Sequence, residues 1–134
     1  MPTIFTKIIN REIPCYQVAE NENFLAFLDI NPIAKGHVLV VPKIELDYIF
    51  DLEDDILSLM LPFAKKVAAG IKKHIKCNRI GIAVIGLEVP HAHMHLIPLQ
   101  DHGTIDFTVK KLSFEPKMMM NLAKLIEESI MYDK

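Results

Sequence analysis

The sequence has no long apolar segment, and little else that would address it to a membrane. In a chain of 134 residues, its apolar runs fall far short of the ~20 residues that a membrane-spanning helix requires. Met1–Lys7 lacks the charged-then-apolar layout of a secretory signal peptide. Only two cysteines are present, Cys15 and Cys77, which favours reduced thiols but leaves a disulfide between them open. We therefore expect a cytoplasmic protein without a membrane partner.

The chain also lacks an excess of charge of one sign. Its 15 Lys and Arg residues face 17 Asp and Glu residues, which gives a formal net charge of -2. This balance argues against a nucleic acid polymer as partner, although a small nucleotide stays compatible with it. No repeat, linker or low-complexity stretch divides the sequence, and 51% hydrophobic residues suffice for one core. The length predicts a single domain spanning residues 1–134.

Three segments have the apolar spacing of helices. A short helix is predicted near residues 4–9, and a long one from 53 to about 76 that Pro62 should kink or divide. Ser113 is the expected N-cap of a last helix that runs to about Tyr132. Each helix has one apolar stripe, so we expect each to bury that stripe against another part of the chain.

Strands are predicted from alternating or β-branched residues. They lie near residues 16–18, 24–30, 37–41, 79–85 and 91–97. A polar turn at 20–23 joins the first two as a hairpin, and the short link between the last two favours an antiparallel pair. The chain is thus expected to be α+β, with helices packed on an antiparallel sheet.

The most informative stretch is a row of histidines at 91, 93 and 95 that alternates with apolar residues. On a strand, His91, His93 and His95 would share one face, about 6.5–7 Å apart along the chain. Packing explains such a row poorly, because three polar rings on one face need three sets of hydrogen bonds. The row predicts either transition-metal binding or chemistry on a phosphate, with one imidazole as nucleophile and the others as hydrogen-bond donors.

The stretch from His91 to Ile97 resembles the signature of the histidine-triad (HIT) family at all seven positions. The blocks Ile4–Ile9 and Phe27–Lys43 are similar to the family as well, and in family order. The resemblance covers about the first hundred residues and is closest to the HINT-like nucleoside-phosphoramidase branch. It implies a HIT core at about 3–100, with a five-stranded antiparallel sheet and one long helix. A C-terminal helical extension at about 113–132 follows, and two chains join their sheets in a homodimer.

The resemblance also implies the site of a nucleotide hydrolase without a cofactor. His93 would attack the α-phosphorus of a purine nucleotide conjugate, a phosphoramidate or a dinucleotide, and the nucleotidyl-histidine would then be hydrolysed. His95 and His37 would contact the phosphate oxygens, and His91 would support the others. The ribose-binding acid is Asp29, whose alternative role is to cap the turn before Asn31. The remaining nucleotide-binding residues implied are Phe5, Ile8, Phe27, Ile30, Glu88 and Val89.

Two departures from the family pattern bear on metal and rate. Thr3 and Thr6 stand where several bacterial relatives have a Cys-x-x-Cys pair for structural zinc, so no metal is expected. The loop before the histidine row is shortened, with Leu87 in place of the usual glutamine and Glu88 where serine is frequent. Loss of one donor to the phosphate costs roughly 10²–10³ in rate. A nucleotide-binding regulatory protein with little turnover is therefore the alternative, followed by a metal-binding protein that uses the histidine row.

Overall fold

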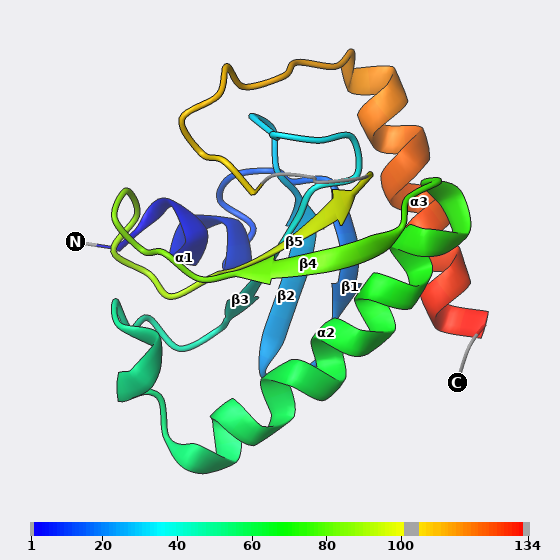
Figure 1. Ribbon diagram of the computed structural model, residues 1–134. Coiled ribbons are helices and arrows are strands. Elements are labelled where there is room, and N and C mark those ends of the chain that lie inside the picture. The colour runs from blue at the N-terminus through cyan, green and yellow to red at the C-terminus, as the bar shows by residue number, and fades with distance from the viewer. Residues whose placement is uncertain (1, 101–104, 133–134) are drawn as a thin grey trace.

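A computed structural model describes residues 2–100 and 105–132 of the chain. Its elements in chain order are α1 (Ile4–Ile9), β1 (Gln17–Glu20), β2 (Phe24–Leu28), β3 (Val38–Pro42), a 3₁₀ turn (Ile49–Asp51), α2 (Asp54–His74), β4 (Arg79–Ala83), β5 (Met94–Leu99) and α3 (Pro116–Tyr132). The strands form one open antiparallel sheet in the order β1-β2-β3-β5-β4 (Figure 1). The predicted α+β class with a five-stranded antiparallel sheet, a long helix and a C-terminal helix is confirmed.

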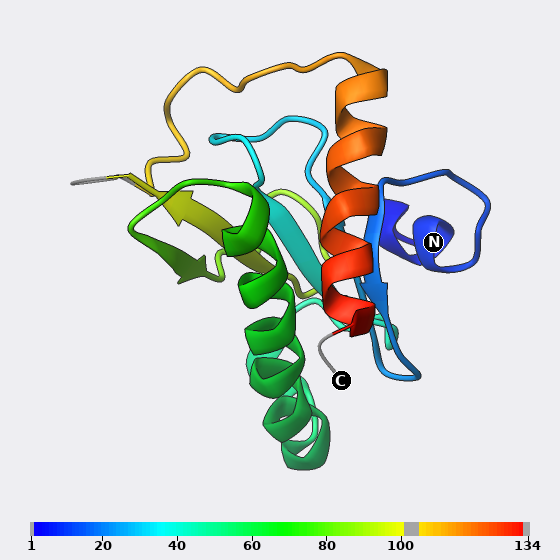
Figure 2. The same cartoon turned by 90° about the vertical axis from the view of Figure 1, so that its right-hand side faces the viewer.

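The sheet separates two apolar layers, because successive strand residues point to opposite sides. α2 and α3 lie side by side against one face, while α1 lies on the other (Figure 2). The α2–α3 layer contains, among others, Val38, Val40, Met94, Leu96, Val67 and Ile126. The α1 layer consists of Phe5, Ile8, Leu25, Phe27, Leu39 and Val41. His95 pairs directly with Leu39 across β3 and β5, so its side chain belongs to the α1 face.

The predicted helices form, with corrections at their ends. α1 has the predicted bounds, and α2 is a single helix that Pro62 does not divide, since this proline lies on its exposed side. The prediction that Ser113 caps α3 is wrong. α3 begins at Pro116, where a missing N–H costs nothing in the first turn, and the carbonyl of Glu115 accepts the first helical hydrogen bond.

The predicted strands are confirmed in number, but their ends differ from the predicted ones. β2 ends at Leu28 rather than at residue 30, and β4 ends at Ala83 rather than at residue 85. β5 begins only at Met94, so His91 and His93 precede it instead of lying within it. The ladder to β3 stops there because the segment after β3 takes over the backbone: the N–H of Ala92 donates to the carbonyl of Leu46.

The structure bears on two expectations from the sequence, one about membrane-spanning helices and one about the two cysteines. Within residues 2–100 and 105–132, none of the helices has the length and hydropathy needed to cross a bilayer. Cys15 and Cys77 are both half-buried free thiols, so the alternative of a disulfide between them is not realised.

Candidate active site

Four buried histidines form a continuous row on the α1 face of the sheet. His37, His91, His93 and His95 are each less than a tenth exposed. Ring centroids are 5.0 Å apart for His93 and His95, and 5.1 Å apart for His37 and His95. The edge of the row is covered by Phe5 of α1, whose ring centroid lies 5.8 Å from that of His91 and 5.0 Å from that of His93. The three motif histidines therefore share one face, as predicted, although only His95 is in a strand.

The tautomer of His93 follows from its backbone contact. Its Nδ1 lies 2.7 Å from the carbonyl oxygen of His91, and a carbonyl only accepts, so Nδ1 carries the proton and donates. The neutral ring then keeps an unshared lone pair on Nε2, which is the form a nucleophilic imidazole needs.

His37 and His95 form a directed hydrogen-bonded pair. The backbone N–H of Ile33 donates to Nδ1 of His37 at 3.2 Å, so the proton of His37 sits on Nε2. That Nε2–H donates to Nδ1 of His95 at 2.9 Å, which leaves His95 with its own proton on Nε2. His95 thus offers a donor beside His93. Both ring nitrogens of His37 are engaged within the protein, and its Nε2–H orients His95; the phosphate contact that the resemblance implied for His37 stays a prediction.

Burial keeps this pair uncharged. Removal from water is the largest cause that lowers the pKa of His37 to about 4 and that of His95 to about 3. Burial also lowers the pKa of His91. At neutral pH all three rings are therefore neutral, which the directed hydrogen bonds require.

His91 is fixed from both ends of its ring. Nε2 donates to the carbonyl oxygen of Pro42 at 2.8 Å, and Nδ1 accepts from Oγ1 of Thr3 at 2.8 Å. The side chain of Glu45 accepts from the N–H of Thr3 and from Oγ1 of Thr6, which ties α1 to the segment after β3. This network holds Phe5 and the carbonyl of His91 in place with hydrogen bonds. Glu45 was not predicted from the sequence, because no local pattern indicates a contact across so long a sequence separation. Glu45 is 42 residues from Thr3 and 39 residues from Thr6.

Asp29 lies where β2 turns toward His37. Its Oδ1 accepts from the N–H of Asn31 at 2.9 Å, which is the capping contact weighed as its alternative role. Its second oxygen, Oδ2, is 3.6 Å from Nε2 of His37, and the side chain is 20% exposed. One carboxylate oxygen therefore serves the turn while the other faces the histidine cluster.

The implied apolar wall is assembled only in part. Phe5, Ile8 and Phe27 are buried together, and Val89 packs against them. Ile30 is 64% exposed, and it is not a member of that cluster. Glu88 and Leu87 are exposed on the loop before His91, with Leu87 at 88%. In the apolar cluster the structure brings four of the implied residues together and leaves Ile30 and Glu88 outside it.

The ligand atoms of Asp29, His37 and His95 all lie within 4.8 Å of one another, which is compact enough for a metal ion. The hydrogen bonds argue against that use. Nδ1 of His37 already accepts from a backbone N–H, so its Nε2 must carry a proton and has no lone pair for a metal. Both nitrogens of His91 are also engaged, which disfavours the alternative of a metal bound by the motif row.

Two residues near the row were missed from the sequence. The ring of Phe107 lies 4.7 Å from that of His95 and 6.3 Å from that of His37, measured between centroids. Nζ of Lys111 is 5.5 Å from the centroid of the Phe107 ring. Both belong to the stretch at 99–112, for which the sequence predicts no helix or strand, and of which residues 101–104 lie outside the described chain.

Comparison with known proteins gives concordant matches. A family model described as HIT domain matches residues 10–102, which include all four histidines. An uncharacterized HIT-like protein of Borreliella burgdorferi is 35% identical over 135 residues, covering 95% of this chain and 97% of that protein. The adenosine 5'-monophosphoramidase hnt1 of Schizosaccharomyces pombe is 40% identical over 100 residues, covering 73% and 74%. A crystal structure of a hypothetical histidine triad nucleotide-binding protein from Sulfolobus tokodaii matches with a TM-score of 0.80 at 32% identity, covering 96% and 91%.

Proposed function

The chain belongs to the HIT domain family, and from this premise we propose that it hydrolyses purine nucleotide conjugates at the α-phosphate. The observation that carries the proposal is the backbone hydrogen bond of His93, which leaves Nε2 of this ring with a free lone pair beside the Nε2–H donor of His95. The relative in Schizosaccharomyces pombe, named an adenosine 5'-monophosphoramidase, supports a phosphoramidate as the substrate class.

In the proposed reaction, Nε2 of His93 attacks the α-phosphorus and the bond from phosphorus to the leaving nitrogen breaks, while that nitrogen takes a proton from solvent. His95 donates a hydrogen bond to a phosphoryl oxygen, whose negative charge grows in the transition state. Water then attacks the phosphorus and breaks its bond to His93. The water supplies the new oxygen of the nucleoside monophosphate and releases one proton to solvent, and His93 returns to its starting form.

Single-turnover mixing with adenosine 5'-phosphoramidate tests the proposal. With enzyme in excess, we expect ammonia to appear first and AMP to follow as the covalent intermediate is hydrolysed. Tight binding of AMP without any release of ammonia would instead establish the alternative, a nucleotide-binding regulatory protein. One feature favours that alternative: the side chains of residues 84–90 include no amide, and Leu87 is turned to solvent.

Asp29 gives a prediction about sugar recognition. If its free oxygen accepts hydrogen bonds from the ribose hydroxyls, Asp29→Ala should weaken AMP binding by about 1.5–3 kcal/mol, as for hydrogen bonds to a charged group. It should weaken binding of 2',3'-dideoxy-AMP much less, and calorimetric titration compares the two losses. Asp29→Asn is the matched control, because its amide oxygen can still cap the turn at Asn31. Equal losses for both ligands would assign Asp29 to the turn alone.

The exposed edge of the sheet supports the predicted homodimer. Among the described strands β4 pairs with β5 alone, so its outer edge is unpaired, and Ile82, Val84 and Ile85 on and beyond it are 40–50% exposed. A second copy at this edge would continue the sheet and cover these side chains. Sedimentation equilibrium should then give twice the chain mass of 15.3 kDa. Ile82→Lys should shift the protein toward monomer, whereas Met120→Lys on α3 should not; a monomeric wild-type protein at micromolar concentration would exclude the dimer.

A further inference from the structure

The connection from β5 to α3 returns over the histidine row. In Figure 1 it arches above the turn that joins β2 to β3. The N–H of Leu112 donates to the carbonyl of Pro32 at 2.8 Å, which ties the connection to the turn that carries Asp29 and His37. The stretch 105–112 of this connection is therefore anchored beside the site by the backbone of Leu112.

The anchored segment places one aromatic ring and one ammonium group near the row. Phe107 packs edge-on against His95, with 4.7 Å between the ring centroids. Nζ of Lys111 donates to the carbonyl oxygen of Phe107 at 2.6 Å and lies 5.5 Å from the centroid of the same ring. The half-buried lysine is thus held at the residue that contacts His95 instead of extending into solvent.

The histidine row lacks the charge that a bound phosphate demands. His37, His91 and His95 are neutral at pH 7, and the carboxylate of Asp29 would repel an anion. The loop at 84–90 has no basic or amide side chain to compensate. Lys111 is close enough that its positive charge, after burial, contributes to the lowered pKa of both His37 and His95.

We propose that Lys111 binds the phosphate of the nucleotide. Phe107, which packs against His95, positions the ammonium group of Lys111 for this contact. The inference rests on the proposed function, since it assigns a further residue to the same site. Lys111 supplies the electrostatic partner that Leu87, in place of an amide donor, does not supply. The cation comes from a segment after the histidine row, so the site is completed by the part of the chain that leads into α3.

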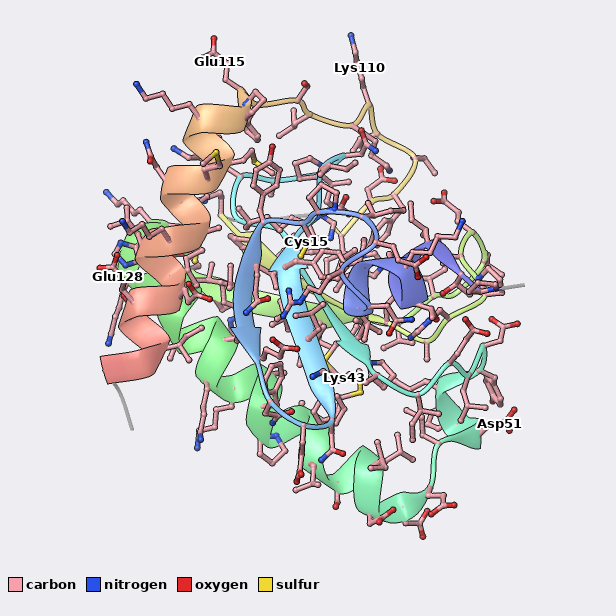
Figure 3. The ribbon with its side chains drawn as sticks, turned by 180° about the vertical axis from the view of Figure 1, so that it is seen from behind. Cys15, Lys43, Asp51, Lys110, Glu115 and Glu128 are labelled. Atoms are coloured by element: carbon pink, nitrogen blue, oxygen red, sulfur yellow. The ribbon has the colours of Figure 1, made fainter. Side chains whose placement is uncertain are left out.

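Calorimetric titration with AMP and with adenosine tests the proposal, because only AMP has the phosphate. We expect Lys111→Met to weaken AMP binding by roughly 10- to 100-fold, as for a hydrogen bond to a charged group, and to leave adenosine binding unchanged. Lys111→Arg should retain most of the AMP affinity. Lys110→Met is the matched control: this neighbouring lysine is exposed and points outward in Figure 3, so neither affinity should change.

The outcomes separate this proposal from the one on which it rests. Equal AMP affinities for Lys111→Met and Lys110→Met, both folded by circular dichroism, would overturn the role of Lys111 and leave the proposed function standing. A wild-type protein that binds adenosine and AMP equally well would do the same. A wild-type protein that binds neither would overturn the proposed function and the phosphate contact with it.

Discussion

Replacing His93 by alanine is expected to abolish turnover of adenosine 5'-phosphoramidate while AMP binding stays largely intact. The substitution removes the only atom assigned to bond formation with phosphorus, whereas His95, Asp29 and Phe27 remain to hold the nucleotide. The loss in kcat should therefore exceed the roughly 10²–10³-fold cost of losing one hydrogen-bond donor. His74→Ala is the control, since His74 lies at the end of α2 and bonds to Ser129 of α3; it should have near-normal turnover.

The covalent intermediate gives this prediction a direct readout. Base quenching of the wild-type reaction should preserve a nucleotidyl adduct, because a phosphoramidate bond survives alkali better than acid, and peptide mass spectrometry should map it to His93. His93→Gly with added imidazole should regain part of the activity, since the small molecule fills the vacated space and brings its own lone pair. An adduct on a different residue, or a His93→Ala protein with wild-type turnover, would remove the mechanism.

Between pH 7 and pH 5 the free energy of unfolding is expected to fall by about 3–4 kcal/mol through His37 and His95 alone. In the unfolded chain both imidazoles take up protons below their ordinary pKa of about 6.5. In the folded protein burial keeps them neutral until about pH 4 for His37 and about 3 for His95. The unfolded state therefore binds more protons over this interval, and stability falls as the pH falls, by about 2 kcal/mol for each ring at pH 5.

Urea denaturation at both pH values measures this difference. A protein in which His37 and His95 are replaced together by glutamine should lose most of the pH dependence, even though its stability at pH 7 is also changed. His74→Gln, on the exposed end of α2, should retain it. Equal stability of the wild-type protein at pH 5 and pH 7 would contradict the neutral, hydrogen-bonded pair.

The sequence predicted the sheet and the shared face of the three motif histidines from local information. The alternation at 91–95 places three rings on one face whether or not the backbone is formally a strand, so the shared face was predicted correctly although β5 begins after His93. What failed were the ends of elements, which depend on partners. The extended stretch at 91–93 does not continue the ladder to β3, because the carbonyl of Leu46, far away in the chain, accepts from the N–H of Ala92.

The positions of the histidine ring protons, and the contacts of Glu45 and Lys111, could be found only from the tertiary structure. No spacing indicates that the N–H of Ile33 fixes the proton of His37, or that the carbonyl of Pro42 fixes that of His91. Glu45 and Lys111 were missed for the same physical reason, since isolated charged residues in polar segments are usually solvated. Only the return of a distant segment brings each one to the site.

The central strand pair also determines when the site can come into existence. β3 is synthesised long before its partner β5, and His37 is separated from His95 by 58 positions. A nascent or truncated chain that stops before residue 94 exposes the apolar edge of β3, which is a template for aggregation until β5 arrives. Closing that edge and joining the two imidazoles depend on the same strand pairing, because Leu39 pairs with His95 itself. Partly folded chains should consequently lack the histidine pair and be prone to aggregation at the same time. Any molecule that has completed its sheet has also formed the His37–His95 pair.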